Sequence, residues 1–521
     1  TRARAYPLND IPPDGYTRAY IASKSSVKDL TRSPLLASTW EPIGPLDTDS
    51  RGRTISVAVN PLNPNTLYCG SASGGLWRSY HASTGGDWTR VYLGFPALGI
   101  GSITIDPADS NIMYVGTGEV YRYGYAVGGL IVRTTRGSYG VGILKTTNGG
   151  ISWAKSLDWS YNQQRGVQQV RINPLNRKTL FAATTEGIYR SYDAGANWTS
   201  VLPILMATDV VINKKDTTQL LAACGNFKSA GYGIYRSTDG GNNWSLTAGG
   251  QSAYSGKTLL DTYEANNNIV YASVADSVTS AGGLWKSTNF GSAWTLVISY
   301  PPDPNGNGFY GVQGWYSHYV AIHPTDSSKI VHAGLYSTKS VDGGVTFVSA
   351  GGGYSDNHNY ARDPNNANIL DIVNDNGSYR STDFGGTYTN IGNGTQTRQF
   401  YNGFSNSSTD SLLAMGQSQD HIPGYLYRGS TVWERTAVDE VGWTGIDPTN
   451  DFVMYAAGRG SSGGSSIYKS TDRGFSFPGG VGFSGYANWN SPFVIAPSSS
   501  NVLYFGTTFV FKTINAGTNW A

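Results

Sequence analysis

Acidic and histidine side chains that could do acid–base chemistry or hold a metal fall in a few irregular segments. Glu119 opens a tyrosine-rich segment, and Asp356, His358 and Asp375 lie close together further along. Two carboxylates facing a sugar can hydrolyse a glycosidic bond, so Glu119, Asp356 and Asp375 are the candidate catalytic residues. A His/Asp group can bind a metal, but this spacing matches no known site. We predict neither a metal nor another cofactor, and the competing interpretation is that these polar groups only cap sheet ends.

Aromatic side chains gather in the same irregular segments. Rings on one surface are common where a protein binds carbohydrate or another protein, although the same rings can equally pack loops together. The candidate ligand-binding residues are Tyr121, Tyr123, Trp315, Tyr316, His358, Asp420, His421 and Trp489.

A repeat defines the elements that must position these segments. The pattern Ser-x-Asp-x-Gly-x-x-Trp returns with a period of roughly 45 residues, which is typical of a repeat architecture. The intact copies are Thr146–Trp153, Ser191–Trp198, Ser237–Trp244, Ser287–Trp294, Ser340–Phe347, Ser381–Tyr388, Ser470–Phe477 and Thr513–Trp520. Two further copies, Leu76–Trp88 and Leu426–Trp433, keep the strand before the turn but lose the pattern. The sequence therefore contains ten units.

Each residue type in the pattern suits a tight turn between two strands. Asp or Asn at the third position accepts hydrogen bonds from the backbone two residues on, and Ser or Thr at the first position can bond the same turn. Glycine at the fifth position allows a positive φ, and the final aromatic residue anchors the turn on its neighbour. We therefore interpret the repeated residues as scaffold. They include Asp193, Asp239, Asp342, Asp383, Asp472, Trp153, Trp198, Trp244, Trp294 and Trp520.

Four short strands per unit predict an all-β fold of antiparallel four-stranded sheets, which is the plan of a β-propeller. We expect residues 40–521 to form a single ring of ten such sheets, and residues 1–39 to pack on it as an extension with a helix over Tyr16–Leu30. The segment Ser38–Ile43 resembles a fourth strand. It would complete the last unit and close the ring, which removes free sheet edges.

The strand order also predicts two unequal faces. In a meander, the first-to-second and third-to-fourth turns share one face, and these turns are short and regular. Every long segment falls on the other face, where function concentrates on variable loops held by a rigid frame. These segments are Gly118–Val141, Asp158–Gly166, Ser299–His318, Ser349–Tyr360, Gly416–Gly424 and Pro478–Asn490.

Composition excludes some partners. The net charge is +2 without a basic run, so nucleic acid is not an expected partner. No apolar stretch reaches the roughly 20 residues that span a bilayer. Cys69 and Cys224 fall in units that are not neighbours, so we predict two free, buried thiols. Abundant Ser, Thr, Asn and Tyr with little Lys or Glu favour an extracellular protein.

The repeated turn resembles the Asp-box, or BNR repeat, of sialidases, xyloglucanase-type glycoside hydrolases and the sortilin ectodomain. Sortilin-type domains imply one ten-bladed ring. The chain is also similar to secreted propeller proteins of Bacteroidetes that the type IX system exports, which implies a secreted or cell-surface location in a bacterium. The motifs that carry this second resemblance are Arg51–Ile55, Gly116–Glu119, Val312–Tyr316, Asp356–Asn359, Asn374–Gly377 and Gln399–Tyr401.

The enzymes among these relatives fit less well. A sialidase should carry an Arg-Ile-Pro motif ahead of Arg51 and Arg53, and none is present. A xyloglucanase-type enzyme should carry a carboxylate in the first unit, where Ser71–Gly75 has none, and ten units cannot make two seven-bladed rings. We therefore favour a non-catalytic binding or assembly module that presents an aromatic face to a glycan, polymer or protein at the cell surface, alone or in a larger assembly. The alternative is a glycoside hydrolase or lyase of the xyloglucanase-like class.

Overall fold

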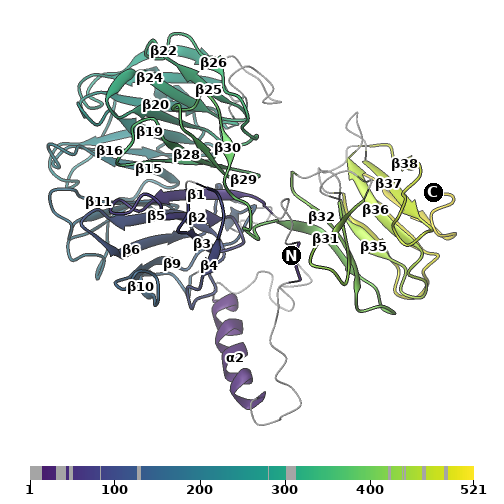
Figure 1. Ribbon diagram of the computed structural model, residues 1–521. Helices are drawn as coiled ribbons and strands as arrows, with labels where there is room; N and C mark the ends of the chain where they lie inside the picture. The colour runs from purple at the N-terminus through teal and green to yellow at the C-terminus, as the bar shows by residue number, and fades with distance from the viewer. Residues whose placement is uncertain are drawn as a thin grey trace. The chain divides into compact units, whose positions relative to one another are not determined.

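The computed structural model describes residues 14–30, 43–45, 51–82, 84–125, 131–162, 164–277, 279, 281–300, 313–420, 424–436, 438, 442–459, 465–485 and 491–521 (Figure 1). This part of the chain holds ten antiparallel sheets, nine with four strands and one with three, together with a short hairpin. Their strands follow one another in chain order, as the sequence predicts. Contacts divide the chain into two compact units, Thr1–Thr39 with Thr54–Asn393 and Trp40–Arg53 with Gly394–Ala521.

The first unit contains seven four-stranded sheets. Sheets one to four are formed by β1 (Thr54–Val59), β2 (Leu67–Ser71), β3 (Leu76–Ser79) and β4 (Thr89–Val91); β5 (Ile100–Asp106), β6 (Asp109–Thr117), β9 (Gly142–Thr146) and β10 (Ala154–Asp158); β11 (Val167–Ile172), β12 (Leu180–Thr184), β13 (Gly187–Ser191) and β14 (Thr199–Leu202); β15 (Ala207–Ile212), β16 (Leu220–Cys224), β17 (Gly233–Ser237) and β18 (Ser245–Leu246). Sheets five to seven are formed by β19 (Thr258–Thr262), β20 (Val270–Ala275), β21 (Gly282–Ser287) and β22 (Thr295–Tyr300); β23 (Tyr319–His323), β24 (Asp326–Ala333), β25 (Ser337–Ser340) and β26 (Val348–Ser349); β27 (Asn359–Arg362), β28 (Leu370–Asn374), β29 (Gly377–Ser381) and β30 (Thr389–Asn390).

These seven sheets close into a ring of the β-propeller kind. Strand β1 packs against β5 on one side and against β27 and β28 on the other, so the seventh sheet meets the first. Residues of all seven first strands line one central channel of about 560 Å³. The expected single ring of ten sheets is therefore wrong. The repeat gives the number of sheets, but not which of them close on one another.

The second unit holds three consecutive sheets. They are formed by β31 (Phe400–Asn406), β32 (Leu413–Ser418), β33 (Tyr425–Arg428) and β34 (Glu434–Arg435); β35 (Thr444–Ile446), β36 (Met454–Arg459), β37 (Ser465–Ser470) and β38 (Gly480–Gly482); β39 (Phe493–Ile495), β40 (Leu503–Gly506) and β41 (Val510–Thr513). The strand expected over Ser38–Ile43 lies outside the described residues except for Ile43. The Ile43 carbonyl accepts a hydrogen bond of 2.9 Å from Trp433 Nε1, the residue before β34.

The repeated turns have the hydrogen bonds that their residue types predict. In the turn after β17, Ser237 Oγ donates to Asp239 Oδ1 at 2.9 Å, and the same carboxylate oxygen accepts from the Asn243 backbone at 2.9 Å. The Gly241 N–H donates to Ser237 Oγ at 2.9 Å, with a φ of 81° at the glycine. The Ser/Thr-to-Asp/Asn bond recurs in all eight intact copies. These residues therefore hold the hairpins between the third and fourth strands.

Apolar residues fill the space between sheets. Every residue of β12 and β16 is buried, and Trp198 Nε1 bonds Ser156 Oγ of the preceding sheet at 2.9 Å. Cys69 and Cys224 are buried and free, as predicted. The sheets thus pack through small and branched side chains from their inner strands.

Helix α2 (Gly15–Leu30) has nearly the predicted bounds and contacts the first unit through residues near its N-terminal end. Thr17 Oγ1 donates to the Ser160 carbonyl at 2.7 Å, and the Tyr20 hydroxyl donates to the Gly94 carbonyl at 2.9 Å. Among the described residues, no helix has the length and apolar character needed to cross a membrane.

Candidate functional site

Meander topology gives the first unit two faces, which we name by their connections. The turn face carries the first-to-second and third-to-fourth turns. The loop face carries the second-to-third loops and the connections between sheets. The largest insertion there is the hairpin of β7 (Arg122–Tyr125) and β8 (Ile131–Thr134), which lies between β6 and β9. At the loop-face end of the channel, Glu119, Tyr121, Lys257 and His358 contribute to the wall.

Four rings from three different sheets meet on the loop face, and we call them the aromatic cluster: Tyr121, Phe227, Trp315 and Tyr316. The Tyr121 ring stands edge-on to Trp315 and Tyr316, with centroids 5.3 and 5.4 Å away. Phe227 lies 5.5 Å from Trp315. Tyr121 and Tyr316 are buried, whereas Trp315 and Phe227 are partly exposed. The buried tyrosines therefore pack against the Trp315 ring, and Trp315 in turn contacts Phe227.

Two arginines lie over rings of the aromatic cluster. The Arg122 guanidinium is 5.4 Å from the Phe227 centroid. The Arg136 guanidinium is 4.5 Å from Tyr316 and 5.8 Å from Trp315. These distances are within the range of cation–π attraction, so the arginines and rings stabilise one another.

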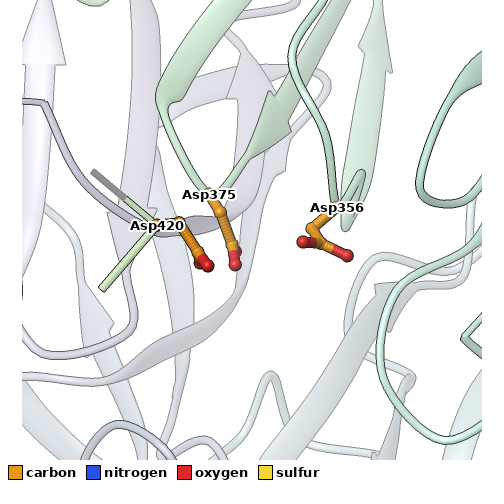
Figure 2. Close-up of side chains that lie close together, drawn as sticks. All are labelled: Asp356, Asp375 and Asp420. Atoms are coloured by element: carbon orange, nitrogen blue, oxygen red, sulfur yellow. The ribbon is translucent and has the colours of Figure 1, made fainter. Parts of the chain in front are cut away.

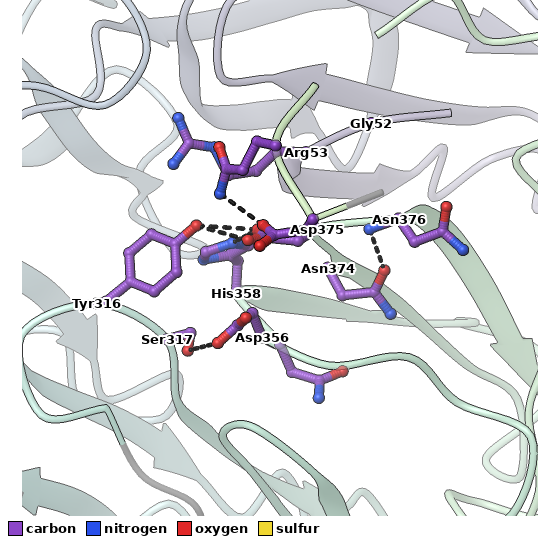
Figure 3. A network of polar contacts seen from close by, with 12 residues as sticks. Gly52, Arg53, Tyr316, Ser317, Asp356, His358, Asn374, Asp375 and Asn376 are labelled. Atoms are coloured by element: carbon purple, nitrogen blue, oxygen red, sulfur yellow. Dashed lines mark hydrogen bonds and ion pairs between the residues drawn. The ribbon is translucent and has the colours of Figure 1, made fainter. Parts of the chain in front are cut away.

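Asp375 forms the buried polar centre next to the cluster (Figure 3). It sits in the tight turn between β28 and β29 and is 1% exposed. The Tyr316 hydroxyl lies 2.8 and 3.0 Å from its two carboxylate oxygens, and His358 Nε2 lies 2.6 Å from Oδ1. Tyr316 also stands edge-on to the His358 ring at 4.8 Å. The network orients Asp375 and joins it to the aromatic cluster.

Asp356 is a second buried carboxylate on this face (Figure 2). Its Oδ1 accepts hydrogen bonds from Ser317 Oγ at 3.1 Å and from Gln313 Nε2 at 2.5 Å. Carboxylate oxygens of Asp356 and Asp375 lie within 4.8 Å of one another. Two carboxylates this close can share a proton or a cation.

Glu119 is held where the inserted hairpin returns. The Tyr121 hydroxyl donates to its Oε1, and the residue is 3% exposed. A Cβ on Gly137 would lie 2.5 Å from a Glu119 oxygen and 2.3 Å from the Ala72 carbonyl. Only glycine allows the returning chain to approach this carboxylate so closely.

Lys257 brings a positive charge to the same end of the channel. Its Nζ donates to the Tyr316 carbonyl at 3.3 Å. Burial lowers the pKa of Lys257 to about 8, and the carboxylates of Asp209 and Glu119 offset part of that effect. The amine is therefore charged at neutral pH but close to its titration point.

A chain of buried polar groups runs behind Lys257. His318 Nδ1 lies 2.8 Å from Ser273 Oγ, which lies 3.1 Å from His332 Nε2. The Tyr300 hydroxyl is 2.9 Å from the same His332 nitrogen. Burial lowers the pKa of His332 to about 3 and that of His318 well below its usual value. Both imidazoles are therefore neutral at ordinary pH. We interpret this row of hydrogen-bonded side chains as structural support for the loops.

The structure brings together most of the residues singled out from the sequence. Tyr121, Trp315, Tyr316, His358, Glu119, Asp356 and Asp375 all lie at one end of the first unit. Asp420 belongs to the second unit, where its carboxylate accepts from Gln419 Nε2 at 2.6 Å. His421, Trp489 and the side chain of Tyr123 lie outside the described residues.

Four participants were missed from the sequence: Phe227, Lys257, Arg122 and Arg136. None belongs to a recognisable motif. Their position in long second-to-third loops or connections was the available signal, and it does not distinguish them from other loop residues.

Comparison with solved structures shows which fold this is. A GH74 enzyme from Niastella koreensis matches with a TM-score of 0.59 and 16% identity over 92% of this chain and 73% of that chain. The GH74 xyloglucanase from Xanthomonas campestris matches with a TM-score of 0.54 and 16% identity over 91% of this chain and 87% of that chain. An ancestral GH74 enzyme matches with a TM-score of 0.54 and 14% identity over 92% of this chain and 69% of that chain. No protein-family model and no curated protein matches the chain. At such identities the likeness is one of fold.

Proposed function

We propose that this protein is a binding module that takes a glycan on the loop face of its first unit. The observation that carries the proposal is the aromatic cluster, in which buried Tyr121 and Tyr316 pack against the partly exposed Trp315 ring, and Trp315 contacts the partly exposed Phe227. A sugar ring offers an apolar face that stacks on such a surface. Because packing already fixes these rings, little side-chain entropy is lost on binding.

The surroundings of the aromatic cluster favour a glycan, and not a flat protein surface, as the ligand. Polar groups surround the rings, and the channel of about 560 Å³ opens beside them. Pockets of this size with a few fixed polar groups are typical of small-ligand sites. One solved structure of the same fold is named a xyloglucanase, an enzyme that acts on a glycan.

Substitution of the accessible rings tests the proposal. We expect Trp315→Ala and Phe227→Ala each to weaken binding of a retained polysaccharide by about two- to tenfold, since an aromatic contact contributes roughly 0.5–1.5 kcal/mol. Affinity electrophoresis through gels containing xyloglucan, polygalacturonate, alginate or β-glucan would measure this. Tyr192→Ala is the matched control, because Tyr192 is 58% exposed on the turn face. Retardation by none of the polysaccharides, or equal loss in the control, would refute the proposal.

The cellular location of the protein is part of the same proposal. The turn chemistry, together with motifs such as Val312–Tyr316 and Asp356–Asn359, supports an Asp-box protein that resembles sortilin and type IX cargo and is secreted or held at a bacterial cell surface. Protease treatment of intact Bacteroidetes cells that express the chain should degrade it. Full protection until the cells are lysed would contradict this location.

The second candidate function is that of a glycoside hydrolase or lyase, and the pair of carboxylates of Asp356 and Asp375 favours it. Their oxygens lie within 4.8 Å, buried beside the accessible rings. Retaining enzymes place two carboxyl groups about 5–5.5 Å apart. The test is release of reducing ends from a bound polysaccharide. If Asp375→Asn abolishes this release but retains binding, the protein is such an enzyme and not a non-catalytic binding module.

A further inference from the structure

One buried side chain joins the two accessible rings of the aromatic cluster. Phe227 lies in the loop between β16 and β17, whereas Trp315 lies in the connection before β23. Asn226 is 1% exposed, and its Nδ2 donates to the Trp315 carbonyl at 2.9 Å. Its Oδ1 accepts from the Phe227 N–H at 3.0 Å. One amide group therefore bridges the backbone segments that carry both rings.

The loop around Asn226 is held by hydrogen bonds of its own. The Asn226 N–H donates to Ser229 Oγ at 3.2 Å, and the Ser229 N–H donates back to the Asn226 carbonyl at 3.1 Å. The Gly225 N–H donates to the Met206 carbonyl at 2.8 Å. The side chain and the backbone of Asn226 are thus both hydrogen-bonded, which is what burial of a polar residue requires.

The segment that carries Trp315 is anchored as well. The Tyr316 N–H donates to the Gln313 carbonyl at 2.8 Å, which closes a turn around Trp315. The Lys257 N–H donates to the Gly314 carbonyl of that turn at 2.7 Å. The carbonyl that accepts from the buried amide therefore belongs to a turn that is fixed beside the start of β19.

The backbone at Phe227 has an unusual conformation for its residue type. Its φ is 48°, and that of Lys228 is 59°, in the left-handed region that favours glycine. Phe290 and Phe384 share this conformation, but they are 0% and 1% exposed and pack in apolar cores. Phe227 is partly exposed, and its ring contacts Trp315. A strained backbone that carries a partly exposed ring indicates a functional role for that ring.

We propose that Asn226 is a positioning residue of the glycan site, and that its amide sets the spacing of the Phe227 and Trp315 rings. This inference rests on the proposed function. Because Asn226 is buried, it acts on a ligand through the two rings. Without the amide, the Phe227 loop and the Trp315 turn would move independently, and binding would have to order them, which lowers affinity.

A double-mutant cycle tests the inference with the whole chain, by the same affinity electrophoresis. Asn226→Ala should weaken binding of the retained polysaccharide by about two- to tenfold, the range expected for loss of one aromatic contact. In a Trp315→Ala background the same change should weaken binding clearly less, because one of the two rings that the amide holds is already gone. Equal losses in both backgrounds, or unchanged binding by Asn226→Ala itself, would overturn the inference.

A measurement without ligand separates this inference from the glycan proposal. Oxidation of Trp315 by N-bromosuccinimide, followed by peptide mass spectrometry, should be faster in Asn226→Ala than in the wild type. Unchanged oxidation would overturn the inference. Faster oxidation without retardation by any polysaccharide would refute the glycan proposal, while the positioning of Trp315 by Asn226 would stand.

Asn243→Ala is the matched control. Asn243 belongs to the same sheet but lies in the turn after β17 on the opposite face, where its Nδ2 donates to Asp239 Oδ2 at 2.7 Å. This variant should leave binding and Trp315 oxidation unchanged. Asn226→Ser is a milder second variant, since its shorter side chain keeps a hydroxyl near the Phe227 N–H but removes the bond to Trp315. It should give the same results as Asn226→Ala, and melting temperatures show which variants are folded.

Discussion

At the scale of single residues, the candidate site combines rings, guanidinium groups and buried carboxylates that hold one another in place. Tyr316 is the link: its ring contacts Trp315 and Tyr121, its hydroxyl bonds Asp375, and its carbonyl accepts from Lys257. Each contact uses a different part of one side chain or its backbone. The accessible surface at Trp315 is therefore set by groups that a ligand would not touch.

Lys257 gives a prediction at this scale. Because burial lowers its pKa to about 8, from the usual 10.5, the neutral amine should form at a pH where most lysines are still charged. Its acetylation by acetic anhydride, followed by peptide mass spectrometry, should rise with a midpoint near pH 8. Glu119→Gln removes a carboxylate that favours the charged form, so it should shift the midpoint lower. A wild-type midpoint near 10.5 would contradict this account.

At the scale of elements, the sequence predicted the hairpins well because their chemistry is local. Ser237, Asp239 and Gly241 lie within five positions, and each has one dominant role in a tight turn. The loop face followed from topology, so Tyr121, Trp315 and Tyr316 could be placed together before their contacts were known. Phe227 and Lys257 could not, since their neighbours come from other sheets and no periodicity marks them.

The turns also make a prediction about acid stability. Hydrogen bonds from the Asn243 backbone and side chain lower the pKa of Asp239 to about 2, and Asp193 and Asp342 are lowered to about 2 by their own turn partners. A carboxyl group with a lowered folded-state pKa stabilises the fold above its unfolded pKa, and that stability is lost as the pH falls. The melting temperature should therefore drop between about pH 4 and pH 2.

Asparagine provides the matched variant, because Asn148 and Asn289 already occupy this position in other copies. Replacing Asp193, Asp239 and Asp342 together by Asn should keep the turns but remove three titrating groups. The drop in melting temperature between pH 4 and pH 2 should then be smaller than in the wild type. An unchanged drop would show that other carboxylates determine the acid response.

At the scale of the whole molecule, the division of the sheets was the feature that sequence could not supply. Ten similar units predict ten sheets, but closure depends on long-range contacts between the first and seventh. Trp88 Nε1 donates to the Ile391 carbonyl at 2.7 Å, and Cys69 Sγ lies 3.0 Å from Ser378 Oγ. Val57, Val373 and Ile391 pack in one apolar core. None of these contacts is encoded in a local pattern.

Closure of the first ring predicts that residues 54–393 fold without the rest of the chain. All seven sheets are then present and β1 meets β27, so no inner strand loses its neighbouring sheet. The expressed segment should be soluble, melt cooperatively and keep the polysaccharide binding of the whole chain. The matched control is residues 54–349, which lack the seventh sheet and leave the apolar faces of the first and sixth sheets uncovered. This shorter segment should aggregate. Aggregation of both segments would show that the seven sheets depend on the second unit for their stability.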